Sequence, residues 1–230
     1  MKRTFKPRLD ILPAAQRRIW PELKGVADLG YVLYGGTAIA LRLGHRASVD
    51  FDFFTDRALD RPALGMALPA LTRATLLQDA PYTVTALAPV GKARVKLSFF
   101  SGLRIGRVGT PDWTDDGVLQ VASLDDLLAT KLKVLLQRVE AKDYADVWAI
   151  LDAGVELSAG LAAARILYGA TFQPTECLKA LVYFKGEELN ALSRATRSRL
   201  IEAVNGVRSL PRRRRLSRSL AATAARRPRD

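Results

Sequence analysis

One feature most constrains the fold of this chain. It is an apolar run that ends at a pair of glycines and is followed by a second apolar run in which acidic residues alternate with hydrophobic ones. The first run, residues 31–34, ends at residues 35–37, Gly-Gly-Thr, where we predict that a helix begins. The second run, residues 48–54, places Asp50 and Asp52 between hydrophobic residues. Side chains at i and i+2 of a strand emerge on the same face. The spacing therefore predicts a strand whose two carboxylates point together.

Two neighbouring carboxylates repel each other unless a cation lies between them, and Mg²⁺ favours carboxylates together with the oxygens of a substrate phosphate. We therefore predict that Asp50 and Asp52 are ligands of Mg²⁺. Glycines let the backbone approach a phosphate closely, and the N–H groups at a helix start favour an anion. Gly35 and Gly36 are accordingly predicted to bind nucleotide phosphates, with Thr37 as a helix N-cap or a phosphate-binding hydroxyl.

Residues 34–54 closely resemble the first motif of the AbiEii/AbiGii toxin family of nucleotidyltransferases, within the polymerase-beta-like superfamily. Residues 127–146 resemble the later Lys…Arg…Asp-x-x-Asp motif of that family. The residues that carry this second motif are Lys131, Arg138, Asp143 and Asp146. The resemblance covers roughly residues 15–150, with an uncertainty of a few residues at each boundary.

The resemblance implies a Mg²⁺-dependent enzyme that transfers NMP from an NTP to an acceptor and releases pyrophosphate. tRNA is the candidate acceptor, and the implied setting is a bacterial toxin–antitoxin or phage-defence system with a cognate antitoxin protein. Lys131 is then expected to neutralise charge on the leaving group. The resemblance also implies that Asp143 or Asp146 belongs to the catalytic site; the alternative is an N-cap and a surface acid.

The pattern of elements predicts an α+β fold: a nucleotidyltransferase-type mixed sheet flanked by helices, with a helical C-terminal half. Alternating runs at residues 82–88 and 93–100 predict antiparallel strands. Further short strands are expected, and helices are predicted at three places. The short strands are expected near residues 31–34, 103–107 and 118–121, and the helices at residues 11–29 (with a break near Pro21), 37–43 and 62–77. We predict a core at residues 1–122, a helical region at 123–206 that completes the active-site cleft, and a tail at 207–230.

The helix that begins at Ser123 has an apolar stripe and two cations along its edge. Ser123 and Asp126 resemble a capping box, and Asp126 is expected on the solvated side. Lys131 and Arg138 border the buried face, which costs free energy unless an anion meets them. Their partners are either triphosphate oxygens or an internal carboxylate such as Asp146, and for Arg138 a structural ion pair is an equal alternative.

Several further residues complete the predicted site. Arg46 is a candidate phosphate ligand, and Ser48 supplies a hydroxyl near the metal. His45 is the only histidine, which excludes a multi-histidine metal site. The family pattern places a third carboxylate on a later strand, and the matching position here is Ser98. Either Asp143 or Asp146 fills that role, or a single metal suffices, or activity has been lost.

Composition limits the partners. The chain has a formal net charge of +13, so an acidic polymer is a natural partner. Residues 207–230 contain nine arginines and one aspartate. We predict that this tail is disordered and either contacts RNA phosphates without base specificity or remains solvated. The single cysteine, Cys177, favours a reducing cytoplasm, and no run approaches the ~20 apolar residues of a membrane span.

The sequence is also compatible with two functions other than RNA modification. The first is a catalytically silent nucleic-acid or partner-binding module that retains the nucleotidyltransferase fold, which Ser98 favours. The second is a nucleotidyltransferase that acts on a small molecule or a protein side chain. The pair Asp50 and Asp52 opposes the first alternative, and the net charge of +13 opposes the second. Sequence does not specify the oligomeric state.

Overall fold

The computed structural model describes residues 3–222, which form two compact units. Unit 1 contains residues 3–106, 110–123 and 217–222 of this range. Unit 2 contains residues 107–109 and 124–216. The chain therefore leaves unit 1 for a helical unit and afterwards returns to unit 1 for a short segment.

Unit 1 is built on a mixed sheet that has eight strands within the described residues, in the order β1-β7-β8-β2-β3-β6-β5-β4. The central strands β3 and β6 run parallel, whereas β2 pairs with β3 and β5 pairs with β6 in the antiparallel sense. The strands are β1 (Thr4–Phe5), β2 (Val32–Tyr34), β3 (Asp50–Phe54), β4 (Thr75–Ala80), β5 (Thr83–Val90), β6 (Ala93–Phe100), β7 (Asp112–Thr114) and β8 (Gln120–Val121). The predicted α+β class is confirmed.

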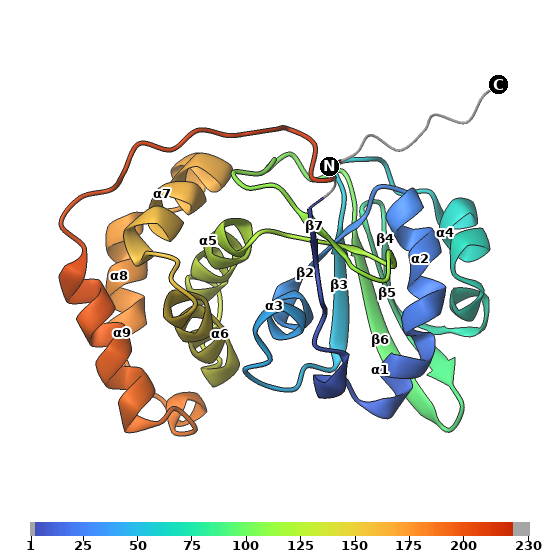
Figure 1. Ribbon diagram of the computed structural model, residues 1–230, viewed down its shortest axis with the longest axis horizontal. Helices are drawn as coiled ribbons and strands as arrows, with labels where there is room; N and C mark the ends of the chain where they lie inside the picture. Colours follow the sequence, from blue (N-terminus) through green and yellow to red (C-terminus); the bar gives the residue numbers. More distant parts are fainter. Residues whose placement is uncertain (1–2, 223–230) are drawn as a thin grey trace. The chain divides into compact units, whose positions relative to one another are not determined.

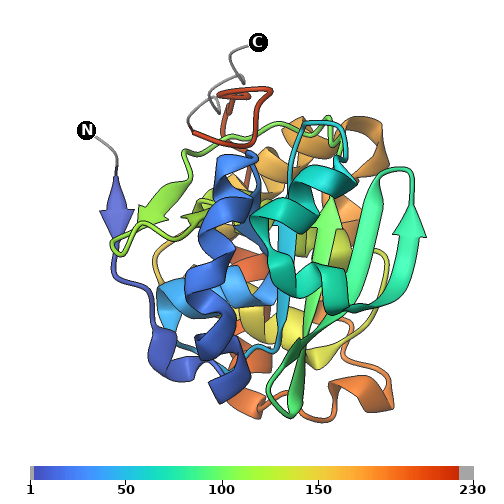
Figure 2. The same cartoon turned by 90° about the vertical axis from the view of Figure 1, so that its right-hand side faces the viewer.

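Helices cover both faces of this sheet. The short helices α1, α2 and α4 lie against one face, as Figure 2 shows, and α3 lies on the opposite face in Figure 1. Phe51, Phe53 and Phe99 fill the core on the α1 side; all three are fully buried, and the ring of Phe53 stacks with those of both Phe51 and Phe99. The helices are α1 (Ala14–Ile19), α2 (Lys24–Asp28), α3 (Gly35–Leu43) and α4 (Arg61–Ala67), with 3-10 turns at Leu9–Ile11, Trp20–Leu23 and Pro69–Arg73.

Helix α3 follows β2 without a connecting loop and ends where the sequence predicts. Gly44 adopts φ 67°, a left-handed conformation that glycine accepts without steric cost and that commonly terminates helices. On the last turn, Arg42 donates hydrogen bonds to the carbonyls of Val121 and Ala122 and forms a 3.0 Å ion pair with Asp112. These contacts fasten α3 to the β8 end of the sheet.

Some predicted elements of unit 1 are wrong. The helix expected at residues 62–77 ends at Ala67, and residues Thr75–Ala80 form the edge strand β4. Pro69 is the physical reason, because proline disfavours helical backbone at the residue before it and lacks an N–H donor. The strand expected at 103–107 is absent from the described residues; β1 and β7, which the sequence did not reveal, form that edge of the sheet instead.

Unit 2 is helical, as predicted. Its helices are α5 (Leu124–Leu135), α6 (Ala141–Asp152), α7 (Leu157–Tyr168), α8 (Pro174–Val182) and α9 (Arg194–Gly206), with 3-10 turns at Gly169–Thr171 and Glu187–Leu189. Gly160 of α7 packs directly on Leu128 of α5, so closely that a Cβ at residue 160 would collide with the leucine side chain. This glycine allows the two apolar helices to approach each other across the core of the unit.

Residues 207–222 differ from the disordered tail that their composition predicts. The chain is extended after α9, as Figure 1 shows in orange-red and red, and Leu220 and Ala221 are buried in unit 1. The carboxylate of Asp56 accepts the backbone N–H of Leu220 at 2.9 Å. Burial of the Leu220 side chain stabilises the ordered conformation of this segment, which its arginine content alone does not predict. Residues 223–230 of the predicted tail lie outside the described residues.

Among the described residues, no single helix combines the length and hydropathy of a membrane span. The segments Ala141–Asp152 and Leu157–Thr171 meet those criteria together, but they are bent by 118° at the break between them.

Candidate active site

The two predicted metal ligands lie on the partly exposed positions of β3. Asp50 and Asp52 alternate with the buried Phe51 and Phe53, so both carboxylates emerge on the face opposite the aromatic core. Lys96 pairs in register with Asp50, and its Nζ lies 3.4 Å from Asp50 Oδ2. The sheet therefore brings two carboxylates and one ammonium together on one face.

The glycine turn lies directly against these carboxylates. A Cβ at Gly35 would collide with Asp52 Oδ2, and the φ of Gly35 is +71°, a conformation that L-residues rarely adopt. A Cβ at Gly36 would collide with the guanidinium of Arg46 and would lie 3.2 Å from Ser48 Oγ. The backbone conformation and Asp52 together favour glycine at residue 35, whereas at residue 36 an added Cβ would displace the Arg46 guanidinium.

Thr37 differs from the N-cap expectation. The helix already begins at Gly35, its N-cap is Tyr34, and Thr37 lies in its first turn with only 1% of its surface exposed. The Thr37 hydroxyl hydrogen-bonds to the backbone carbonyl of Asp50 and lies 2.8 Å from Ser48 Oγ. Thr37 therefore fastens the start of α3 to the start of β3, which fixes the glycine turn relative to the carboxylates.

Ser98 occupies the position on β6 at which the family pattern leads us to expect a third carboxylate. It pairs in register with Asp52 on β3 and with Thr85 on β5, and only 2% of its surface is exposed. Its hydroxyl is uncharged, so it is a poor substitute for a carboxylate as metal ligand or general base. On the adjacent strands β3 and β6 the acidic residues are therefore Asp50 and Asp52.

The donor chemistry of this face fits a hard divalent cation. Mg²⁺ is commonly held by one or two carboxylates, with waters and substrate phosphates as the remaining ligands. Within residues 3–222, no group of three or more His, Cys, Asp or Glu side chains could hold a metal ion. Asp50 and Asp52 thus fit an ion whose coordination a phosphorylated substrate completes.

The other predicted catalytic residues form a buried cluster in unit 2. Lys131 Nζ lies 2.7 Å from Asp143 Oδ1 and 2.7 Å from Asp146 Oδ2, and both aspartate side chains are fully buried. Arg138 Nε donates to Asp143 Oδ2 at 2.9 Å. We call Lys131, Arg138, Asp143 and Asp146 the lysine cluster.

The contacts of the lysine cluster correspond to one of the alternatives that the sequence left open. Lys131 and Arg138 both meet an internal carboxylate, as one alternative held. The reading of Asp143 and Asp146 as an N-cap and a surface acid is wrong, because both are buried and the N-cap of α6 is Glu140. Sequence periodicity placed the two acids on one helical face but did not reveal what covers that face.

Charge neighbours control the ionisation of Asp143. Burial alone would raise the pKa of this carboxyl, but the hydrogen bonds and positive charges of Arg138 and Lys131 outweigh burial and lower the pKa below its usual value. Asp143 is therefore ionised when the cluster is formed. The cluster is held together by charge as well as by packing.

Asp126 is a structural residue that sequence reasoning placed wrongly. It was expected on the solvated side of α5, but only 1% of its surface is exposed. Its two carboxylate oxygens accept the backbone N–H groups of Val108 at 2.8 Å and Gly109 at 3.1 Å. These bonds attach the segment 107–109 to unit 2. The local sequence around Asp126 does not predict them, because the N–H donors lie 17 and 18 residues away in the chain.

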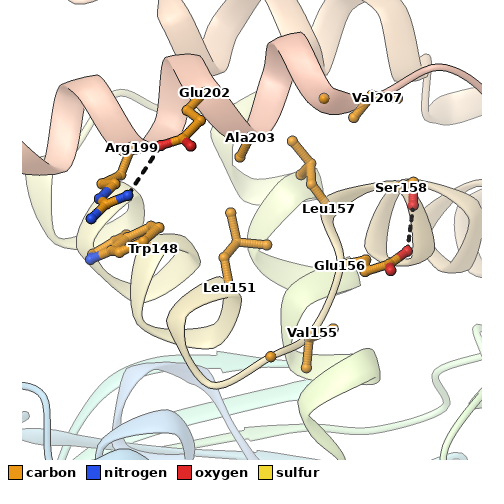
Figure 3. Close-up of a pocket in the computed structure, with 12 residues that line it drawn as sticks. Trp148, Leu151, Val155, Glu156, Leu157, Ser158, Arg199, Glu202, Ala203 and Val207 are labelled. Carbon is orange, nitrogen blue, oxygen red and sulfur yellow. Dashed lines mark hydrogen bonds and ion pairs between the residues drawn. The ribbon is translucent and has the colours of Figure 1, made fainter.

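Unit 2 also contains a pocket, shown in Figure 3, between the α6–α7 corner and α9. Leu151, Leu157 and the ring of Trp148 line it. An ion pair of 3.2 Å between Arg199 and Glu202 lies along its α9 side. None of the predicted site residues lines this pocket, so it contributes nothing to the chemistry considered above.

Comparison with known proteins gives three findings. The family described as "Nucleotidyl transferase AbiEii toxin, Type IV TA system" matches residues 24–219. An uncharacterized protein of Aquifex aeolicus (strain VF5) is 31% identical over 135 residues, which cover 56% of this chain and 63% of that protein, less than two thirds of its length.

The third finding is a likeness of structure. The MenT4 nucleotidyltransferase toxin of Mycobacterium tuberculosis H37Rv superposes with a TM-score of 0.53, over 85% of this chain and 86% of that one. The two sequences are 12% identical, so this likeness is one of fold. It agrees with the mixed sheet, flanking helices and helical C-terminal half described above.

Proposed function

This chain belongs to the AbiEii nucleotidyl transferase toxin family of type IV toxin–antitoxin systems, and from that premise we propose that it transfers NMP from an NTP to an acceptor hydroxyl. In this reaction the acceptor oxygen bonds to the α-phosphorus, the bond to pyrophosphate breaks, and the hydroxyl proton is released. The observation that best supports the proposal is the glycine turn lying against the Asp52 carboxylate on the strand that also presents Asp50.

Asp50 and Asp52 are the residues that would hold a divalent cation, which we propose is Mg²⁺. Such an ion, when bound, stabilises charge on phosphate oxygens and favours the ionised form of a nearby hydroxyl. Lys96 already neutralises part of the charge on Asp50. It allows the two carboxylates to share one sheet face before substrate and metal arrive.

The glycine turn and Arg46 are the proposed phosphate ligands. Gly35 and Gly36 begin the nine-residue helix α3, whose first N–H groups have no intrahelical partners. The partly exposed Arg46 lies beside Gly36, where its charge offsets that of the β- and γ-phosphates. Thr37 and Ser48 hold the turn in position through their mutual contact at 2.8 Å.

The lysine cluster has a role in positioning that the contacts support, and a catalytic role that we propose from the family motif. A buried ammonium with two buried carboxylates is an arrangement that packing does not require, since apolar residues fill such space at equal or lower free energy. Its presence is consistent with retention for function. Substitution of Lys131, Asp143 or Asp146 should therefore lower transfer even when the variants are compared with wild type at equal folded fraction.

The acceptor and the biological setting are proposals that rest on the family and on charge. We propose RNA, with tRNA as the first candidate, because the chain has a formal net charge of +13. A cognate antitoxin protein and a cytoplasmic location complete the proposal. A catalytically silent binding module is the competing function, and the uncharged Ser98 beside Asp52 is the observation that favours it.

The test is transfer of label from each α-³²P-NTP to total tRNA in the presence of Mg²⁺. Wild type is compared with Asp50→Asn and Asp52→Asn, which keep side-chain size, and with the control Asp28→Asn at an exposed position of α2. Labelled RNA with wild type and the control, but not with the other two variants, supports the proposal. Label in a small product supports the small-molecule alternative, and no label in any product contradicts transfer and favours the silent module.

A further inference from the structure

The segment after α9 is an exposed, arginine-rich chain that contributes no residue to the candidate active site. We call residues 207–218 the basic strap. It contains six arginines and no acidic residue. These arginines are Arg208, Arg212, Arg213, Arg214, Arg215 and Arg218, and all of them are exposed.

The strap is ordered because its backbone and two of its arginines are tied to unit 2. The N–H of Leu216 donates to the carbonyl of Arg107 at 2.8 Å. Arg215 donates to the carbonyl of Ile166 on α7 at 3.0 Å, and Arg213 forms a 3.2 Å ion pair with Asp125 on α5. Figure 1 follows the strap as an extended chain from the end of α9 toward α7.

Most of this charge is not neutralised. In the part of the chain that the structure describes, Asp125 is the carboxylate partner of Arg213, whereas the other five strap arginines form no ion pair. A row of unpaired guanidinium groups repels itself, so holding it in one extended segment costs free energy. A polyanion that binds along the row would remove this repulsion.

We propose that the basic strap is a binding surface for the phosphate backbone of RNA, which rests on the proposed function in taking RNA as the acceptor. An extended chain rises ~3.3 Å per residue and its side chains alternate between two faces, so every second arginine presents a cation on the same face at intervals of roughly 6.6 Å. Guanidinium groups bind phosphate in a bidentate manner. Because the backbone is already fixed, less ordering entropy is lost on binding than for a flexible tail.

The composition of the strap favours nucleic acid over an acidic protein. Protein interfaces have a desolvated core rich in aromatic and apolar side chains. The strap has no aromatic residue, and its exposed large apolar side chain is that of Leu216. Without stacking groups or groups aimed at base edges, it should recognise backbone and not sequence.

The experiment measures binding of a fluorescein-labelled oligo(U) RNA to the full chain by anisotropy, over a series of salt concentrations. The strap variant Arg212→Gln/Arg214→Gln/Arg218→Gln removes three arginines that form no hydrogen bond or ion pair within residues 3–222. The charge-matched control is Arg18→Gln/Lys24→Gln/Arg73→Gln, at exposed positions of unit 1. The same three strap positions changed to Lys keep the charge.

The strap variant should bind roughly tenfold more weakly at low salt, and the slope of log K against log salt should become less negative by about 2. The control and the lysine variant should stay close to wild type, with unchanged thermal unfolding for all. Equal losses in the strap variant and the control would overturn the proposal, and so would an RNA affinity of the strap variant equal to that of wild type.

The inference and the proposed function fail in different ways. The Asp50→Asn/Asp52→Asn variant should bind the RNA like wild type while transferring nothing. If wild type transfers no nucleotide but binds RNA through the strap, the proposed function fails and the inference stands. If the strap variant both binds and labels RNA like wild type, the inference fails and the proposed function stands.

Discussion

Lys131 Nζ lies 2.7 Å from Asp146 Oδ2, and neither side chain is appreciably exposed to solvent. Removing one member of a buried ion pair leaves the other charge unpaired, at a cost of roughly 3–5 kcal/mol. Lys131→Met should therefore destabilise the protein strongly in urea unfolding, and Lys131→Met/Asp146→Asn should recover part of the loss. A single variant within about 1 kcal/mol of wild type would contradict the pairing.

Gly35 and Gly117 provide a matched pair of substitutions. Both have φ +71°, but a Cβ at Gly117 meets no atom within 4 Å, whereas a Cβ at Gly35 collides with Asp52. Each alanine variant should lose about 1 kcal/mol from backbone strain. Transfer activity should fall at least tenfold more in Gly35→Ala than in Gly117→Ala, measured at equal folded fraction. Equal activities would show that the turn does not position Asp52 for catalysis.

The lowered pKa of Asp143 predicts how stability depends on pH. A carboxyl with a depressed folded-state pKa contributes stability above its unfolded pKa of about 4, and this stability is lost as pH falls through the folded-state pKa. Wild type should therefore be more stable than Asp143→Asn at neutral pH. The difference in unfolding free energy should shrink progressively below about pH 4. A difference that is independent of pH between neutrality and pH 3 would refute this assignment.

Ser98→Asp tests whether the sheet face can accept a third carboxylate. A charge at this buried position beside Asp52 should lower the unfolding temperature in the absence of metal. Millimolar Mg²⁺ should then raise that temperature by more than it does in wild type or in the uncharged variant Ser98→Asn, because binding to the folded state stabilises it. The same Mg²⁺ response in all three proteins would argue against a cation at Asp50 and Asp52.

Cys177 should be unreactive in the folded protein. Its side chain is fully buried, and burial raises the pKa of its thiol to about 12. At pH 8 the thiolate fraction is then about three orders of magnitude below that of a free cysteine. Ellman's reagent should modify the native protein at least a hundredfold more slowly than the urea-unfolded protein. Rapid modification of the native protein would mean that α8 opens readily.

Local periodicity predicts the core of the candidate site well, and long-range contacts explain what it misses. The alternation around Asp50 and Asp52 and the left-handed cap at Gly44 depend on neighbouring residues alone, and both are confirmed. The position of Ser98 was predicted from the family resemblance, and the structure pairs Ser98 in register with Asp52. In contrast, the burial of Asp126 depends on a segment that approaches from elsewhere in the chain.

Composition also fails to predict the structure of the strap, because distant contacts determine it. Its arginines predict disorder, but three contacts with unit 2 and the burial of Leu220 in unit 1 hold residues 207–222 in place. Edge strand β4 is a further case, since Leu76 and Leu77 are compatible with a helix until Pro69 and the pairing with β5 decide against it. Propensity is a weak guide where a distant partner determines the structure.

The return of residues 217–222 to unit 1 has a consequence for synthesis on the ribosome. Unit 1, whose sheet presents Asp50 and Asp52, receives the contacts from Leu220 to Asp56 and from Ala222 to Gln120 only after all of unit 2 has been translated. A nascent chain interrupted within the helices would therefore display an unfinished first unit. The contacts that Leu220 and Ala222 add to unit 1 can therefore form only after the whole helical unit has been synthesised.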